Sequence, residues 1–179
     1  MEQWNAIVTA RADRLPKARK GLRALGRVQR TGFYNVLTVT VDEPQSFLER
    51  FEQLLTAHPE LTGAVAHVFP AQQSFDFSSP AEFESKARDA ALTWVPRLAG
   101  KTLHVRVHRR GRKGTLVSPE AERAIANALL AAIAATGKPA RVSFDDPDAI
   151  VLIETIGNRA GISLLTREDY RQHPLLAAK

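Results

Sequence analysis

The chain has 179 residues, of which 44% are hydrophobic, so it can bury a sizeable core and is not expected to be disordered. It contains no cysteine, which excludes disulfides, zinc–thiolate centres and thiol nucleophiles. The formal net charge is +6, and a basic chain of this kind points to a polyanionic partner such as nucleic acid.

The first half of the chain predicts three strands that alternate with two helices. The strands are expected at residues 4–10, 33–41 and 63–77, the last interrupted by Pro70, and the helices at 16–25 and 42–59. Ala18, Leu22 and Leu25 form the inward stripe of the first helix. Its opposite face is basic and carries Lys17, Lys20, Arg23 and Arg27.

The second half predicts a further set of helices and strands. A helix at 80–94 has Ser79 as its N-cap and Pro80 as its first residue, and in the stretch 118–137 Ser118 is the expected N-cap and Pro119 the first residue of another helix. Strands are expected from Leu103, at 149–155 and at 161–166, and the last two are joined by a hairpin-like turn. The polar stretch around Ser78 marks a boundary between two mixed α+β domains, residues 1–77 and 78–179.

The basic residues are separated into two blocks along the chain. Residues 1–30 hold eight Lys and Arg against two acids, and residues 101–123 hold seven against two. Residues 31–100 hold four against nine, and residues 124–179 are balanced at six against six. A surface charged only for solubility would not need this separation, which favours binding of a nucleic acid.

The second basic block begins as a strand and ends as a loop. In the stretch "LHVRVHRRGRKG", which starts at Leu103, apolar residues alternate with polar ones and are followed by a run of cations. Arginine donates two hydrogen bonds to a phosphate, and glycine lets a loop follow an irregular backbone. We predict that this block contacts phosphates through Arg106, His108, Arg109, Arg110, Arg112, Lys113 and Arg123. The alternative is a solvated turn whose charges only aid solubility.

Two other groups of residues raise the question of a metal. His104 and His108 lie four apart on one strand, which is poor spacing for two ligands of one ion, so we interpret them as strand-surface histidines and expect no metal. Asp145, Asp146 and Asp148 surround Pro147, and we interpret them as a turn before a buried strand.

No motif of a known catalytic site is present in the sequence. There is no nucleophile elbow, phosphate-binding glycine loop or dinucleotide fingerprint. The N-terminal residues lack the apolar core of a signal peptide, and the most apolar stretch, residues 124–137, is shorter than the roughly 20 residues that cross a bilayer. We therefore expect a cytoplasmic protein with no membrane partner, no cofactor and no catalytic residues.

The second half resembles the THUMP domain, an RNA-binding module found in tRNA-modifying proteins. The resemblance lies in the strand that ends in "HVRVHRRGRKG", the helix "SPEAERAIANAL", the segment "ARVSFDDPDAIVLIE" and the closing strand "GISLL". The first half resembles the small ferredoxin-like domain that commonly precedes THUMP. In overall layout the chain is similar to the THUMP-only group typified by the tRNA cytidine acetyltransferase adaptor, since no further domain follows the closing strands.

This resemblance implies a tRNA-binding adaptor that presents the acceptor region of tRNA to a separate modification enzyme, with cytidine acetylation as the reaction in its closest group. Besides the loop residues, it implies that the cations of the first helix and Arg159 of the last turn contact RNA. Two alternatives stay open: an RNA-modifying enzyme subunit with an unrecognised active site, and a protein-interaction module that uses the acidic residues 31–100.

Overall fold

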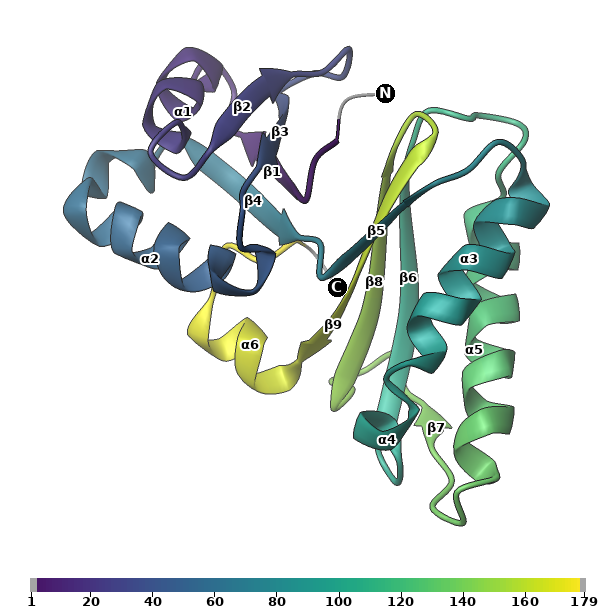
Figure 1. Cartoon of the computed structure of the whole chain (residues 1–179). Helices are drawn as coiled ribbons and strands as arrows, with labels where there is room; N and C mark the ends of the chain where they lie inside the picture. Colours follow the sequence, from purple (N-terminus) through teal and green to yellow (C-terminus); the bar gives the residue numbers. More distant parts are fainter. Residues whose placement is uncertain (1–2, 178–179) are drawn as a thin grey trace. The chain divides into compact units, whose positions relative to one another are not determined.

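The computed structural model describes residues 3–177 and divides them into two compact units, which are described separately. The first unit comprises residues 3–72 together with residues 172–177, and the second comprises residues 73–171. The elements of both units are labelled in Figure 1.

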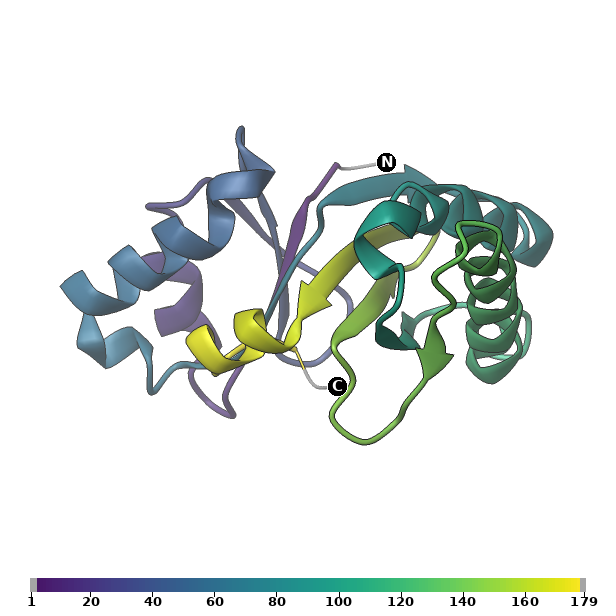
Figure 2. The ribbon, with the colours of Figure 1, turned by 90° about the horizontal axis from the view of Figure 1, so that it is seen from below.

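The first unit is built on a four-stranded antiparallel sheet with the strand order β2-β3-β1-β4. Helices α1 and α2 cover one face of this sheet (Figures 1 and 2). The element bounds are β1 Ala6–Ala10, α1 Leu15–Leu22, β2 Arg27–Arg30, β3 Val36–Thr40, α2 Phe47–Ala57 and β4 Val65–Pro70. Short 3-10 turns lie on either side of α2, at Pro44–Ser46 and Pro59–Leu61.

The core of the first unit lies between this sheet and its helices. Phe47 and Phe51 of α2 are fully buried, and their rings stack with centroids 6.0 Å apart. Ala18 and Leu22 of α1 are buried as their spacing predicts. The end of the chain closes the unit along β4, where the Val68 amide donates to the Leu175 carbonyl at 2.7 Å.

The strand β2 was not predicted, because the sequence continues the helical pattern of α1 to Leu25. The helix in fact ends at Leu22, with Arg23 as its C-terminal cap. The chain then passes so close to β3 that a Cβ on Gly26 would lie 2.1 Å from the Thr40 carbonyl oxygen. Only glycine permits this approach. The prediction that Arg27 lies on the basic face of the helix is therefore wrong, since Arg27 is the first residue of β2.

The second unit contains a five-stranded mixed sheet with the order β5-β9-β8-β6-β7. The β6 strand runs parallel to β7 and β8, whereas β8–β9 and β5–β9 are antiparallel. The bounds are β5 Gln73–Asp76, α3 Pro80–Leu92, α4 Val95–Leu98, β6 Thr102–Arg110, α5 Ser118–Ala134, β7 Arg141–Val142, β8 Ala149–Ile156 and β9 Arg159–Thr166. A short helix, α6 (Arg167–Gln172), follows β9.

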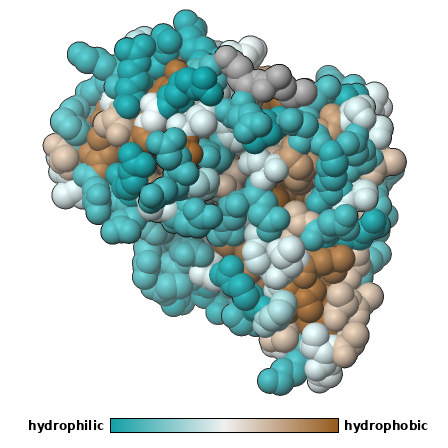
Figure 3. Space-filling view, viewed as in Figure 1, coloured by the Kyte–Doolittle hydropathy of each residue, from teal (hydrophilic) through white to brown (hydrophobic). Residues whose placement is uncertain are grey.

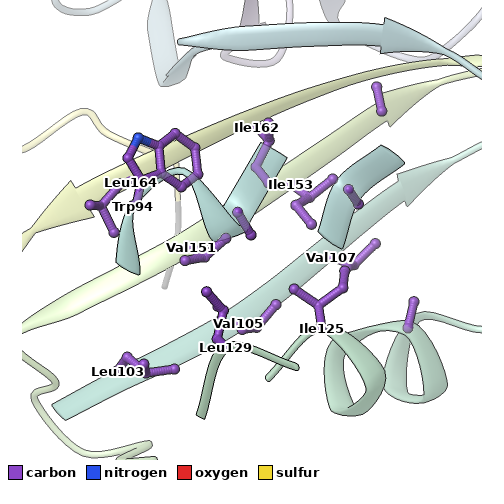
Figure 4. Packing of buried hydrophobic residues seen from close by; sticks show 14 of the residues in the cluster. Trp94, Leu103, Val105, Val107, Ile125, Leu129, Val151, Ile153, Ile162 and Leu164 are labelled. Atoms are coloured by element: carbon purple, nitrogen blue, oxygen red, sulfur yellow. The ribbon is translucent and has the colours of Figure 1, made fainter. Parts of the chain in front are cut away.

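Helices α3 and α5 lie side by side on one face of this sheet (Figures 1 and 2). The core between these helices and the sheet includes alternate residues of the three central strands and a stripe of α5 (Figure 4). Val105 and Val107 of β6 meet Ile125 and Leu129 of α5, which are completely buried. The alternation predicted for the Leu103 strand is therefore the feature that attaches the helix layer to the sheet.

The helix starts in this unit differ from one another. The Ser79 hydroxyl accepts a hydrogen bond from the Glu82 amide at 3.1 Å, which confirms the predicted N-cap of α3. The cap predicted at Ser118 is wrong. Ser118 is already the first residue of α5, and Val117, which has no side-chain acceptor, occupies the cap position.

The predicted strand at 63–77 is two strands in two sheets. β4 ends at Pro70, and β5 pairs with β9 in the second sheet. The compact units accordingly divide after Gln72, whereas the sequence placed the boundary after Phe77. Proline has no backbone donor to continue a ladder, which is consistent with the end of β4 at this residue.

The surface of the second unit is not uniformly polar. Figure 3 shows apolar side chains at the surface around α4 and the nearby ends of α3 and α5. Leu92 of α3, Val95 of α4 and Leu130 of α5 are only partly buried against the core. No helix within residues 3–177 is long and apolar enough to span a membrane.

Candidate nucleic-acid interface

The strand β6 presents its two sets of side chains to opposite faces of the second sheet. Leu103, Val105 and Val107 are part of the core beneath α5. His104, Arg106, His108 and Arg110 alternate with them and therefore lie on the other face. Arg106, His108 and Arg110, which we predict to contact RNA, are thus held on a strand that packs against the core.

The Glu154 carboxylate of β8 neutralises part of this face. Glu154 pairs in register with His108, and its side chain is only 2% exposed. It forms an ion pair with Arg110, and the His108 Nδ1 lies 3.4 Å from its other oxygen. A buried carboxylate needs such partners, so Arg110 and His108 have structural contacts of their own. Whether they also contact RNA stays a prediction.

The loop after β6 is held in place by Arg112. This residue lies in the left-handed region, with φ +54°, between Gly111 and Gly114, which also have positive φ. Its Nε donates to the Asn158 side-chain oxygen at 2.7 Å, and its terminal nitrogen donates to the Ser78 carbonyl at 2.8 Å. Arg112 therefore ties the loop to two other turns, and its contacts resemble those of a structural residue.

Two cations of the block remain more open. Lys113 is exposed in the loop. Arg109 donates from a terminal nitrogen to the Gly111 carbonyl at 3.3 Å, while its Nε is buried and has no hydrogen-bond partner among the described residues. An unsatisfied guanidinium donor is costly to bury, and a phosphate oxygen would satisfy it.

Two more predicted contacts lie on β6 and α5. Arg106 is half-buried on β6, and Arg123 is exposed in the second turn of α5. Neither forms an ion pair within residues 3–177. Together with Arg109 and Lys113 they make up what we call the open cation set, which consists of Arg106, Arg109, Lys113 and Arg123.

Arg159 has a different environment from the open cation set. Its side chain is only 10% exposed and forms an ion pair with Asp76 of β5 at 3.1 Å. This pair joins the first residue of β9 to the last residue of β5, which face each other in the ladder. The geometry gives Arg159 a structural position in the sheet, and its contact with RNA stays a prediction.

In the first unit, the predicted cations do not share one helix face. Lys17 and Lys20 are exposed on α1 and line a hollow of about 470 Å³ with Leu54 and His58. Arg23 and Arg27 are also exposed, but they lie beyond the helix, at its cap and in β2. Of the four predicted cations, Lys17 and Lys20 are therefore the two that share a lined surface feature.

The interpretation of His104 as a strand-surface histidine is wrong. His104 is only 8% exposed, and its ring packs edge-on against the Phe144 ring with the two centroids 4.9 Å apart. Burial lowers the pKa of His104, and the nearby Arg106 lowers it further. Phe144 lies after β7, at the end of the sheet, and it covers the histidine from outside the strand.

The aspartates around Pro147 form a turn that fixes the start of β8. Asp148 accepts hydrogen bonds from the amide and the hydroxyl of Thr102, at 2.8 and 3.0 Å, and these bonds hold its pKa below the usual range. Arg167 bridges Asp146 and Asp148 at 3.1 and 3.0 Å. Within residues 3–177, no three His, Asp or Glu residues come together in a way that could hold a metal ion.

Sequence reasoning missed the partners of the basic loop. Glu154 was counted as part of an apolar strand, although a single acid inside "AIVLIETI" is a signal that a buried cation pairs with it. Asn158 and the Ser78 carbonyl carried no signal, because they lie more than thirty residues from Arg112 and meet it only in the folded chain.

Part of the second unit matches a known protein family. Residues 82–165 match the THUMP domain family. The second unit therefore contains a THUMP domain. The match runs from the first turn of α3 almost to the end of β9, so the THUMP domain includes β6, the basic loop and α5. THUMP domains are associated with the binding and modification of tRNA. A comparison with curated protein sequences finds no match.

Several solved structures share the fold of the THUMP domain and of the unit before it. PH1313 from Pyrococcus horikoshii Ot3 has a TM-score of 0.61 at 14% identity, and the match covers 92% of this chain and 55% of that one. TrmN from Thermus thermophilus has a TM-score of 0.57 at 20% identity, covering 90% and 44%. A 4-thiouridine synthetase in complex with RNA and ATP has a TM-score of 0.55 at 14% identity, covering 92% and 41%. The chain thus spans about half the length of these structures, and at such identities the likeness shows the fold alone.

Proposed function

We propose that this protein binds tRNA through its THUMP domain and presents it to a separate modification enzyme. The observation that carries the proposal is the open cation set, whose four members lie on β6, in the loop after it and on α5, inside the THUMP domain. Two of these cations, Arg106 and Arg109, are held on a strand that packs against the core, and such fixed side chains suit contacts that position a phosphate backbone. RNA duplexes are recognised largely by shape and backbone contacts, which need no base-reading groups.

The first unit supports the same proposal. Its element order, β-α-β-β-α-β, and its strand order are those of a ferredoxin-like domain, and we propose this assignment. The likeness to the RNA-bound synthetase extends over 92% of this chain and therefore includes the first unit. We propose that Lys17 and Lys20 supply a second set of phosphate contacts and that the bound part of the tRNA is its acceptor region.

The adaptor role is proposed from the chemistry of the described residues. They hold no group of three His, Asp or Glu side chains that could bind a metal ion, and the buried Glu154 carboxylate is engaged with Arg110 and His108. We assign the modification chemistry, with cytidine acetylation as the first reaction to examine, to a separate enzyme that acts in the cytoplasm.

A salt titration of tRNA binding tests the RNA-binding part. Each lost phosphate contact should flatten the plot of log affinity against log salt concentration by about 0.7 to 0.9. We expect the variant Arg109→Ala/Lys113→Ala to bind more weakly and with a shallower slope. Arg97→Ala/Lys138→Ala is the matched control, because it removes the same charge from exposed residues of the same unit. Equal slopes for both variants would refute the placement of RNA on this loop.

Competition by tRNA fragments tests the site on the tRNA. An acceptor-stem minihelix should displace full-length tRNA, whereas an anticodon stem–loop of the same length should not. The reverse order would refute the acceptor assignment while leaving tRNA binding intact.

The adaptor part is tested by analysis of nucleosides. The purified protein is incubated with unmodified tRNA, ATP, a methyl donor and acetyl-coenzyme A, and the digested nucleosides are weighed by mass spectrometry. We expect no mass-shifted nucleoside from this chain alone, and capture of the modification enzyme by the tagged chain after nuclease treatment. A modified nucleoside from the chain alone would overturn the adaptor role.

A further inference from the structure

The outer edge of β6 is covered along only part of its length. The short strand β7 pairs with Thr102 and Leu103, and the chain after it donates from the Ser143 amide to the Leu103 carbonyl at 3.0 Å. Four residues further along, the Val107 amide donates to a Glu122 carboxylate oxygen at 2.8 Å. Backbone groups alternate along a strand, so Leu103, Val105 and Val107 all point their amide and carbonyl groups outward.

Val105 therefore lies between two satisfied positions with its own backbone groups open. No described residue bonds to its amide or its carbonyl on this side. The Val105 amide is a donor and the Val105 carbonyl is an acceptor, and both point in the same direction. A planar heterocyclic ring that carries an acceptor and a donor on one edge could pair with both of them. Unpaired backbone groups at a covered site are uncommon in native structures.

A pocket of about 270 Å³ opens onto this part of the edge. Its lining includes His104, Val105, Asn127, Val142 and Phe144. The walls are mainly apolar, and the side-chain amide of Asn127 and the carboxylate of Glu122 add polar groups. This volume is below the roughly 300–1,000 Å³ of pockets for drug-sized ligands, and it suits a single small ring system.

An aromatic ring stands at the mouth of the pocket. Phe144 is 79% exposed, which is unusual for such an apolar side chain, and its ring is held against His104. Arg123, from the open cation set, also lines the pocket. An exposed aromatic ring beside a cation is the combination that binds single-stranded nucleic acid, since the ring stacks on a base and the cation meets its phosphate.

A strand of another protein fits this edge less well. Addition of a strand needs several alternate backbone groups in a row. Here the carboxylate of Glu122 occupies the next position, at Val107, and β7 occupies the previous one. Between Leu103 and Val107, Val105 is the described residue whose amide and carbonyl both lack a partner, so this stretch can pair with one ligand group but not with an extended peptide.

We propose that this pocket takes one unstacked nucleobase of the bound RNA. The base stacks on Phe144, its hydrogen-bonding edge pairs with the amide and carbonyl of Val105, and Arg123 contacts the adjoining phosphate. The inference rests on the proposed tRNA binding and adds to it a site that holds a single-stranded or flipped-out nucleotide. The open cation set positions the backbone, and the pocket fixes the register of one base.

Mononucleotides test the pocket directly, without tRNA. In an amide-resolved NMR titration of the whole chain, AMP and UMP should shift the Val105 amide resonance, and ribose 5-phosphate, which lacks a base, should not. If nucleotides leave Val105 unaffected, the pocket assignment is overturned. If a short extended peptide shifts it instead, the edge belongs to a protein partner and the inference is equally overturned.

The affinity for tRNA tests the stacking contact. We expect Phe144→Ala to weaken binding about tenfold, because it removes the stacking contact with the base. The salt slope should stay unchanged, because the substitution removes no ionic contact with a phosphate. Phe144→Trp should retain affinity, and Tyr34→Ala, which removes an aromatic ring that is 80% exposed in the first unit, is the matched control.

The outcomes separate the two proposals. If the wild type binds tRNA and Phe144→Ala binds equally well, the pocket inference fails and the proposed function stands. If the wild type does not bind tRNA even at low salt, the proposed function fails, and the inference that rests on it fails with it.

Discussion

Arg110 forms an ion pair with Glu154, a carboxylate that is only 2% exposed between the central strands of the THUMP domain. The sequence presents Arg110 as one of a run of cations free to meet a phosphate. The fold instead gives it a partner on the adjacent strand, and the parallel register of β6 and β8 brings the two residues together. Arg110 is thus part of the frame that carries the open cation set.

The first prediction concerns the stability of this pair. Arg110→Ala should lower the free energy of unfolding by about 3 kcal/mol, because it leaves the buried Glu154 carboxylate without its main partner. The double variant Arg110→Ala/Glu154→Leu should regain at least half of this loss. Chemical denaturation measures both. A loss below about 1 kcal/mol in the single variant would show that His108 or water compensates the carboxylate fully.

The second prediction concerns the two loop residues Arg112 and Lys113. Arg112→Ala should cost about 2 kcal/mol of unfolding free energy and speed amide exchange in the loop, because it removes two charge-assisted hydrogen bonds. Lys113→Ala should change stability by less than about 0.5 kcal/mol, since the side chain is exposed. Equal effects of the two substitutions would mean that Arg112 does not hold the loop.

The third prediction concerns the pH dependence conferred by Asp148. Its bonds to Thr102 lower its pKa in the folded state, so their contribution to stability is present above about pH 4 and is lost as the pH falls below this value. Asp148→Asn should lower stability by about 1 kcal/mol at pH 7 and reduce the loss between pH 5 and pH 3. Asp145→Asn, in the same turn but exposed, is the control. Identical acid profiles for Asp148→Asn and the wild type would contradict the assignment.

The fourth prediction compares two serines at helix starts. Ser79→Ala should cost about 1 kcal/mol, because the hydroxyl caps α3 by accepting from the Glu82 amide. Ser118→Ala should be nearly neutral, because Ser118 makes no capping bond in α5. Thermal unfolding of the two variants in parallel measures the difference. A similar loss at both positions would argue that the serines act through something other than capping.

The secondary structure was predictable wherever a single local pattern dominated. Alternating Leu103, Val105 and Val107 predict a strand with one buried face, and the helical spacing of Phe47, Phe51 and Leu54 predicts the buried stripe of α2. The pattern failed at β2, where four residues form a strand only because β3 lies beside them. A strand this short is specified by its neighbour rather than by its own sequence.

For the candidate site, the sequence predicts a location, which stays a prediction, and the structure adds the contacts of each residue. Charge segregation along the chain points to the block around Arg109 without any structure. It cannot distinguish Arg110 and Arg112, which have partners in the fold, from Lys113, which is exposed. Glu154 and Asn158 lie more than forty residues away in sequence, and only the sheet brings them to the basic block.

By itself, then, the sequence determined that the chain is basic in two blocks, forms mixed α+β units and presents a strand that runs into a cationic loop. These properties depend on composition and on residues close together in the chain. Only the tertiary structure decided which cations stay open, that His104 is buried under Phe144, and that Val105 has unpaired backbone groups beside a pocket. These properties arise from pairings between strands and helices distant in sequence, which no local pattern encodes.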